Sequence, residues 1–186
     1  MENQGKFVAD LDEIRRRARE HMESGPVTAG YKANSQAIVA LLNEALATEL
    51  VCVLRYRRHY FMAQGIISEP IAAEFLQHAN DELEHADRLA RRIVQLGGSP
   101  NFDPRGLPDR SASEYVEGMD LKSMIREDLV AERVAVDTYR EMIAFVGDSD
   151  PTTRRLLEDI LAKEEEHADD MATITSQLGA DLKEIA

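Results

Sequence analysis

The chain has 186 residues, which is enough for one domain with a sizeable hydrophobic core. Hydrophobic residues make up 44% and charged residues 31% of the sequence, so a soluble folded protein is expected and a disordered one is excluded. The 22 basic and 35 acidic side chains give a net charge of −13, which argues against a nucleic-acid-binding surface and favours cations as partners.

The sequence shows no sign of a membrane or secretory segment. No apolar run approaches the roughly 20 residues of a membrane span, and the N-terminal region lacks the apolar stretch of a secretory signal. Cys52 is the single cysteine, which rules out an internal disulfide framework. We therefore expect a cytoplasmic protein without a membrane partner.

Residues 1–32 form a predicted N-terminal extension. A loop is expected from Ser24-Gly25-Pro26 to about Lys32, and residues 33–186 are expected to form the main domain. Apolar side chains at helical spacing predict a short amphipathic helix before that loop. These side chains are Val8, Leu11, Ile14 and Ala18.

Two long helices follow, joined by a short turn. The first is predicted over residues 34–64, with Glu49 interrupting its apolar face. The second is predicted from near Ser68 to Gly97. Its apolar face contains three polar residues, which stand where core residues are expected. These are His78, Glu82 and His85.

Residues 97–118 form the longest irregular stretch, and three prolines interrupt it. Within it, Ser111-Ala112-Ser113-Glu114 has the form of a capping box and predicts one short turn of helix. A connection of this length can cross the full length of a helical bundle, whereas the turn after the first long helix cannot.

Two more long helices complete the chain. The third is predicted over residues 120–146, with Glu132 on its apolar face. The fourth opens at Pro151, carries Glu164 and His167, and is expected to end at Gly179. The predicted fold class is therefore all-α: a four-helix bundle with one long crossover between its second and third helices, plus the short N-terminal helix.

A Glu-x-x-His motif occurs twice, at residues 82–85 and 164–167. Residues three apart share one face of a helix, so each motif can direct a carboxylate and an imidazole at one metal ion. The helix before each motif carries one glutamate on its apolar face, Glu49 in the first half and Glu132 in the second. The six candidate metal ligands are Glu49, Glu82, His85, Glu132, Glu164 and His167.

The four carboxylates of this set would repel one another inside a bundle, and burying even one unpaired charge costs several kcal/mol. Two divalent cations would cancel the four charges, and two neutral imidazoles would complete the donor set. Oxygen and imidazole donors without a thiolate suit iron or manganese better than copper(I) or structural zinc. The expected cofactor is a pair of iron ions per chain, with manganese as the alternative.

These motifs resemble those of the bacterioferritin branch of the ferritin-like superfamily. The likeness covers about residues 40–175, and it implies a ferritin-like four-helix bundle. The segments that carry it are Glu49-Leu50-Val51 through Tyr56 and His59, Glu82-Leu83-Glu84-His85-Ala86-Asp87-Arg88, Asp128-Leu129-Val130-Ala131-Glu132, and Glu164-Glu165-Glu166-His167.

The resemblance also implies roles. Glu82 and Glu164 would bridge two irons. Glu49 and Glu132 would be terminal carboxylates, with one histidine on each iron. Tyr56 would donate a hydrogen bond beside the centre and is the candidate catalytic residue; the alternative is a core aromatic residue whose hydroxyl is satisfied. The implied reaction is ferroxidase chemistry, in which dioxygen or hydrogen peroxide oxidises Fe(II) and feeds a ferric mineral inside a hollow homo-oligomeric shell. Dimers would be its building block, in a shell of twelve or twenty-four subunits.

Three features depart from bacterioferritins. Their haem-ligating methionine directly follows the second-helix glutamate, where this chain has Leu83, so no haem is expected. The chain ends 19 residues after His167, which leaves little room for a docked fifth helix. The N-terminal extension has no counterpart in that family.

Several other residues have simpler interpretations. Tyr139 and Cys52 are predicted to be core residues. The alternative for Tyr139, whose position matches that of Tyr56, is an outer contact to the metal site, and the alternative for Cys52, one turn after Glu49, is an approach to that site. His78 is predicted to be an interior histidine with satisfied hydrogen bonds, and the alternative is an outer contact to the metal site. Asp81 is a candidate for transient iron binding at a cavity wall. A basic cluster is predicted to lie at the surface or at an interface: Arg55, Arg57, Arg58 and His59.

Two other functions use a similar fold. A rubrerythrin-like peroxidase or oxidase would store no mineral, but rubrerythrins usually carry a Cys-x-x-Cys module that one cysteine cannot supply. A DNA-protecting mini-ferritin would build its iron sites between subunits. A complete ligand set within one bundle and the net charge of −13 both argue against that function.

Overall fold

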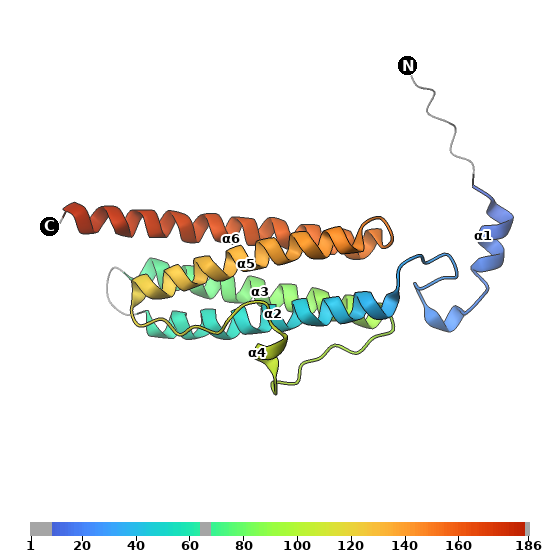
Figure 1. Cartoon of the computed structure of the whole chain (residues 1–186), viewed down its shortest axis with the longest axis horizontal. Helices are drawn as coiled ribbons and strands as arrows, with labels where there is room; N and C mark the ends of the chain where they lie inside the picture. Colours follow the sequence, from blue (N-terminus) through green and yellow to red (C-terminus); the bar gives the residue numbers. More distant parts are fainter. Residues whose placement is uncertain (1–8, 64–67, 185–186) are drawn as a thin grey trace, which may run out of the picture.

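The computed structural model of the protein describes residues 9–63 and 68–184, and all regular structure within them is helical (Figure 1). The elements are α1 (Leu11–Arg17), a 3-10 turn (Met22–Ser24), α2 (Ser35–Met62), α3 (Glu69–Gln95), α4 (Leu107–Arg110), α5 (Leu121–Val146) and α6 (Pro151–Glu184). The predicted all-α class is confirmed.

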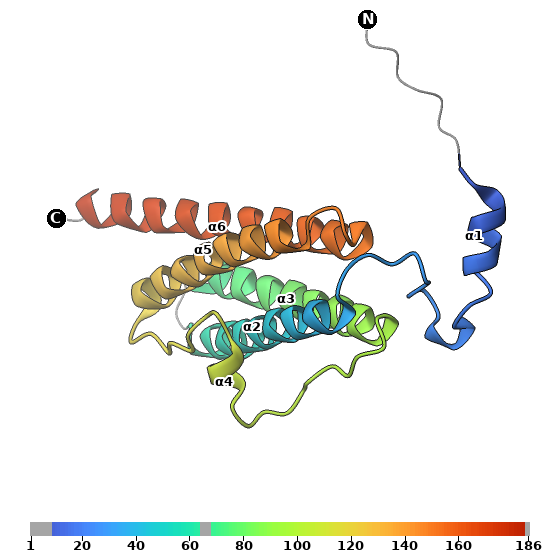
Figure 2. The same cartoon turned by 45° about the vertical axis from the view of Figure 1, so that its right-hand side comes forward.

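Four long helices form the bundle in two antiparallel pairs. α2 packs along α3, and α5 packs along α6. Between α3 and α5 the chain runs along the side of the bundle, with α4 part of the way along it (Figure 2). The predicted crossover between the second and third long helices is therefore confirmed, and it lets α5 lie beside the first pair instead of reversing next to α3.

Local chemistry accounts for several helix ends. Asn34 accepts hydrogen bonds from two backbone N–H groups in the first turn of α2, and Asp120 forms a capping box with Ser123 at the start of α5. Gly147 follows α5 with a φ of 52°, which glycine adopts without steric cost. These caps satisfy backbone groups that the helices themselves leave unpaired.

Two predicted boundaries are wrong. α6 continues through Gly179 to Glu184, because glycine retains its N–H group and destabilises a helix by only about 1 kcal/mol. The short helix of the crossover is α4, which precedes the capping-box motif. Ser111 forms a local turn instead, since its Oγ donates to Ser113 O at 2.7 Å and accepts from Ser113 N at 3.1 Å.

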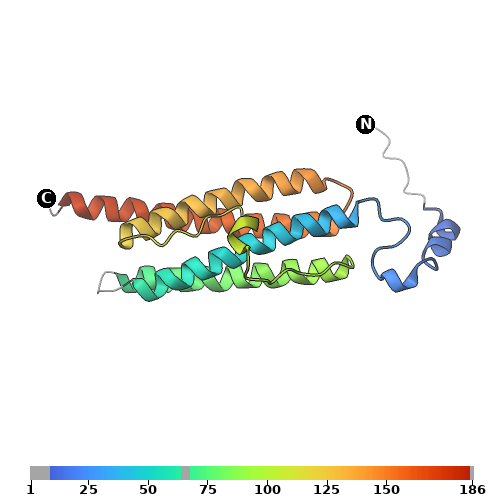
Figure 3. The ribbon, with the colours of Figure 1, turned by 60° about the horizontal axis from the view of Figure 1, so that its bottom comes forward.

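The predicted N-terminal helix is present as α1, but it buries no residue against the bundle. Leu11 and Ile14 are 56% and 44% exposed, and Val8 lies outside the described residues. Figure 3 shows α1 beyond the end of the bundle at which α2 begins. The extension joins the bundle at Tyr31, whose hydroxyl donates to Asp150 Oδ2 at 2.7 Å. The domain division at residue 32 stays a prediction.

Two hydrophobic clusters fill the bundle on either side of a polar layer. Leu42 and Leu89 belong to the first cluster, and Phe75 and Met171 belong to the second. All four side chains are fully buried, and each contributes roughly 1.5–3 kcal/mol of burial free energy. Because both clusters draw on all four long helices, they hold the polar side chains between them in a defined arrangement.

A buried ionic network fastens the end of the crossover to α2. The prediction that Arg55 and His59 lie at the surface is wrong, because they are 1% and 0% exposed. Arg55 Nε donates to Asp128 Oδ1 at 2.9 Å, and His59 Nδ1 lies 2.8 Å from Asp128 Oδ2. The carbonyl oxygens of Glu114 and Glu117 satisfy the other side of this network, at 2.9 Å from Arg55 and 3.0 Å from His59. The crossover therefore covers a face of α2 that the periodicity of the sequence predicts to be exposed.

α2 is long and apolar enough to span a membrane by length and composition, the one such helix within the described residues. This finding differs from the expectation that no apolar run approaches that length. Half of its apolar window is buried inside the bundle, where α2 also places Glu49 and Arg55. The core helix of a soluble bundle has the same features, so they do not place α2 in a membrane.

Asp150, at the start of α6, shows how a buried ion pair contributes to the fold. It is 2% exposed, and each of its oxygens lies 2.9 Å from Arg92 Nη2. Burial acts to raise the pKa of Asp150, but hydrogen bonds from Thr153, Tyr31 and Arg92 lower it to about 2. Its contribution to stability is therefore complete above the ordinary pKa of 3.8 and is lost as the pH falls towards 2.

We predict that Asp150→Asn lowers the free energy of unfolding at pH 7 by about 3 kcal/mol, because Arg92 is then buried without its counter-charge. In urea denaturation, the variant should also lose less stability than the wild type between about pH 4 and pH 2. Asp148→Asn is the control, since that carboxylate is 98% exposed. Equal pH dependence in both variants would contradict the assignment.

Candidate metal centre

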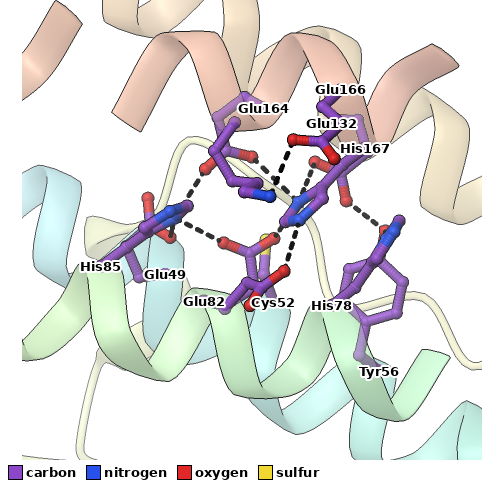
Figure 4. Close-up of polar contacts among 12 residues, drawn as sticks. Glu49, Cys52, Tyr56, His78, Glu82, His85, Glu132, Glu164, Glu166 and His167 are labelled. Atoms are coloured by element: carbon purple, nitrogen blue, oxygen red, sulfur yellow. Dashed lines mark hydrogen bonds and ion pairs between the residues drawn. The ribbon is translucent and has the colours of Figure 1, made fainter. Parts of the chain in front are cut away.

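The six predicted ligands meet in the polar layer of the bundle (Figure 4). One glutamate comes from each of α2 and α5, and one Glu-x-x-His pair comes from each of α3 and α6. All six side chains are at most 3% exposed. Residues from four helices, separated by more than a hundred positions in sequence, thus converge on one buried volume.

The donors form two overlapping groups. Glu49 and His85 belong to one, and Glu132 and His167 belong to the other, while Glu82 and Glu164 belong to both. Within each group, the candidate donor atoms all lie within 4.8 Å of one another. Each group is compact enough to hold one cation, and the two groups have two carboxylates in common.

Both histidines direct Nδ1 into the carboxylate cluster. His85 Nδ1 lies 2.9 Å from Glu164 Oε1, 3.1 Å from Glu82 Oε2 and 3.3 Å from Glu49 Oε2. His167 Nδ1 lies 3.5 Å from Glu82 Oε1 and 3.9 Å from Glu164 Oε2. The opposite nitrogen of His167, Nε2, lies 3.2 Å from Asp81 Oδ2, outside the cluster. A carboxylate behind an imidazole is the usual device for orienting a metal-binding histidine.

Two tyrosines cross between the helix pairs and bind the two unshared glutamates. The Tyr56 hydroxyl on α2 donates to Glu132 on α5, and the Tyr139 hydroxyl on α5 donates to Glu49 on α2. Burial raises the pKa of both phenols, and the charge of the adjacent glutamate raises it further, so both remain donors. In each half of the site, the unshared glutamate therefore accepts a hydrogen bond from a tyrosine of the other helix pair.

Several polar atoms inside the cluster have no hydrogen-bond partner. They are Glu82 Oε1, Glu132 Oε2, Glu164 Oε1 and His167 Nδ1. A buried polar atom without a partner costs about 1–3 kcal/mol. All four atoms belong to residues of the two donor groups, so a divalent cation in each group would supply the missing partners, and the residues therefore fit a metal pair.

The electrostatics of the cluster also favour positive charge. Burial, followed by the charge of Glu82, raises the pKa of Glu49 to about 8 and that of Glu132 to about 7. The same causes raise the pKa of Glu164. For Glu82 itself, burial opposes ionisation, but the close imidazoles of His167 and His85 hold its pKa well below the ordinary range. Without added cations, Glu49, Glu132 and Glu164 thus hold protons more readily than ordinary carboxyl groups, which limits their repulsion with Glu82.

The histidines complement this pattern. Burial acts to lower the pKa of His167, but the Glu82 carboxylate, 3.5 Å from Nδ1, and the charge of Glu132 raise it to about 9. The pKa of His85 is also raised, since the carboxylates of Glu164 and Glu49 close to its Nδ1 outweigh burial. Each ring then acts as a local cation, the role that a metal ion can take over once the imidazole is neutral.

Three further residues near the centre can be compared with their predicted burial and contacts. His78 is buried as predicted, but its hydrogen bonds are not all satisfied, because Nε2 has no partner. Cys52 is 3% exposed, and burial raises the pKa of its thiol, as expected of a core residue. Leu83 is 43% exposed and contributes nothing to the donor set.

Asp81 contacts the centre in a way that the sequence did not predict, whereas Tyr139 is buried as predicted and also makes the outer contact that was its alternative. Asp81 is half-buried and supports His167 across the bundle, and no local pattern around residue 81 indicates that contact. The matched spacing of Tyr56 and Tyr139, each seven residues after a ligand, was the available signal for a paired role.

Comparisons with known proteins agree with this architecture. Residues 39–180 match the Ferritin family, described as the ferritin-like domain. The chain is 31% identical to bacterioferritin BfrA of Mycobacterium tuberculosis over 149 residues, which cover 78% of this chain and 89% of that protein. It is 33% identical over 130 residues to the "Nutrient stress-induced DNA-binding protein" of a Synechococcus species, covering 68% and 74% of the two chains.

Two solved structures have similar folds. A dodecameric thioferritin, the bacterioferritin-related protein from Bacteroides fragilis, has a TM-score of 0.77 and 30% identity, covering 82% of this chain and 92% of that one. Dps from Thermosynechococcus elongatus has a TM-score of 0.71 over 75% of this chain and 90% of its own, and at 18% identity this likeness concerns the fold alone. The chain therefore belongs to the ferritin family, as a ferritin-like domain with bacterioferritin relatives.

Proposed function

We propose that this protein oxidises and stores iron. Two Fe(II) ions bind in the buried cluster, dioxygen or hydrogen peroxide oxidises them, and the ferric product accumulates as mineral inside a homo-oligomeric shell. The observation that carries this proposal is the pair of overlapping donor groups, which share Glu82 and Glu164. Membership of the ferritin family and the bacterioferritin relatives support iron storage in general.

Each residue of the centre has a distinct role in this proposal. Glu49 with His85, and Glu132 with His167, hold one iron each, while the two shared glutamates lie between them. Two bound Fe(II) ions would supply two electrons, which with two protons reduce dioxygen to hydrogen peroxide or hydrogen peroxide to water. Tyr56 keeps the Glu132 carboxylate oriented, and its burial excludes water from that side of the centre. Manganese suits the same donors, and iron is preferred because the relatives are bacterioferritins.

Two observations support a homo-oligomeric shell: the exposed apolar side chains of the bundle and the assembly of a relative. Large apolar side chains are exposed on the long helices, including Leu54, Phe61, Val130 and Phe145, which are between 50% and 70% exposed. Such side chains are commonly covered by partner subunits. The thioferritin relative is dodecameric, which favours twelve subunits over twenty-four for this chain.

Two alternatives remain distinguishable. A rubrerythrin-like peroxidase would use the same centre but would retain only the irons bound there. The DNA-binding relative suggests a Dps-like role. The net charge of −13 and a donor set that is complete within one chain argue against that role.

We predict that Glu82→Ala and His167→Ala each slow Fe(II) oxidation by at least about 100-fold, since losing even an outer partner of a metal ligand costs 10–100-fold. Stopped-flow absorbance under air measures the rate, and circular dichroism checks that the bundle folds. Glu84→Ala is the matched control, because Glu84 is exposed on the same helix. Rapid oxidation in both ligand variants would show that the centre lies elsewhere.

Assembly and iron capacity separate storage from peroxidase activity. We expect light scattering to find a shell of twelve or twenty-four subunits, and aerobic loading to leave far more than two irons per chain in the protein. A dimer that consumes peroxide yet keeps about two irons per chain would refute storage and support the rubrerythrin-like alternative.

The Leu83 position predicts a protein without haem. Purified from cells supplied with iron and haem precursor, the protein should show no Soret absorption band, because no methionine follows Glu82. A stoichiometric Soret band that disappears on mutation of another residue would identify a different haem ligand and overturn this prediction.

A further inference from the structure

A second cluster of metal-binding side chains lies beside the buried centre. It consists of Glu74 and His78, one turn apart on α3, and Asp170 on α6. His78 Nε2 lies 3.4 Å from Glu74 Oε1 and 3.7 Å from Asp170 Oδ2, and all three donor atoms lie within 4.8 Å of one another. The His78 side chain is 0% exposed, whereas those of Glu74 and Asp170 are 31% and 41% exposed. The cluster therefore faces solvent through its carboxylates and the centre through its imidazole.

Hydrogen bonding assigns the tautomer of His78. The Tyr56 hydroxyl has one proton, which it donates to Glu132. Its oxygen can then only accept from His78, whose Nδ1 lies 3.1 Å away. In a neutral ring, a proton on Nδ1 leaves a lone pair on Nε2. The second ring nitrogen of His78 is therefore a free metal donor.

That donor has no partner within the described part of the chain. His78 Nε2 is buried and lacks any hydrogen bond, yet it points at two carboxylates that are acceptors when ionised. Three electron-rich atoms thus face one another without a proton between them. Burial raises the pKa of Glu74, and the charge of Asp170 raises it further, as expected for two carboxylates that repel each other. A cation between the three donors would relieve both the repulsion and the unsatisfied nitrogen.

We propose that Glu74, His78 and Asp170 form a third cation site, which takes a divalent transition metal ion and loads Fe(II) into the buried centre. One imidazole and two carboxylates suit Fe(II), Mn(II) and Zn(II). Partial exposure of the carboxylates allows exchange with solvent, which a loading site needs and a permanent one does not. The loading role rests on the proposed ferroxidase function, whereas the site itself does not.

The structure also connects this third site to the centre. The rings of His78 and His167 stack with centroids 3.9 Å apart, and a hydrogen-bond chain runs from His78 through Tyr56 to Glu132. A cation held at His78 Nε2 therefore lies one imidazole away from the donors of the second iron position. Figure 4 shows His78 and Tyr56 side by side, next to His167.

Zinc, which is redox-inert, tests whether the site exists. Anaerobic equilibrium dialysis against Zn(II) should show one ion per chain fewer in the double variant Glu74→Gln, Asp170→Asn than in the wild type. The matched control is Glu84→Gln, Asp169→Asn, which removes two exposed carboxylates from the same two helices and should bind as the wild type does. Equal zinc binding in the double variant and the control would overturn the proposal and indicate a protonated, metal-free His78.

Iron kinetics test the loading role. In the double variant, we expect the Fe(II) concentration for half-maximal oxidation to rise about tenfold while the maximal rate changes less than twofold, because the centre itself is intact. Unchanged kinetics together with one lost zinc would refute loading. Glu82→Ala separates the two hypotheses: it should lose oxidation and the zinc of the centre but retain the zinc at His78. If Glu82→Ala oxidises iron normally, the proposed function fails and the third site stands on its zinc result alone.

Discussion

Four carboxylates buried in one layer of a helical bundle are the constraint on which the rest of this structure depends. Glu49, Glu82, Glu132 and Glu164 are each at most 1% exposed, so their charges must be cancelled within the protein. The two histidines, the raised carboxyl pKa values and the two tyrosine hydroxyls all serve that end. A site that takes up protons to stay neutral is one that divalent cations can bind by displacing them.

Packing around this layer keeps the carboxylates where repulsion would otherwise separate them. The hydrophobic clusters above and below use residues from all four long helices, so no helix can move without opening a core. The crossover adds a second restraint, because Arg55 and His59 bind Asp128 and the backbone of the crossover together. This network ties α2 to α5, the two helices that carry the unshared glutamates.

The two halves of the centre are alike in donors but differ in their surroundings. The imidazole of His167 is supported by Asp81 and covered by the ring of His78, and no corresponding pair flanks His85 within the described residues. The half-exposed carboxylates of Glu74 and Asp170 lie on the same side. The half of the donor set that contains His167 is therefore the half close to a solvent-facing cluster of carboxylates.

The sequence by itself determined the four long helices, their order and all six candidate ligands. These follow from helical periodicity, since a Glu-x-x-His pair and a lone glutamate on an apolar face are visible within single helices. Only the tertiary structure decided that Arg55 and His59 are buried, that Tyr139 reaches Glu49, that Asp81 supports His167 and that His78 Nε2 has no partner. Each of these depends on which distant segments of the chain lie next to one another. Local periodicity states which face of a helix is apolar, but contacts between helices depend on how packing sets their relative positions.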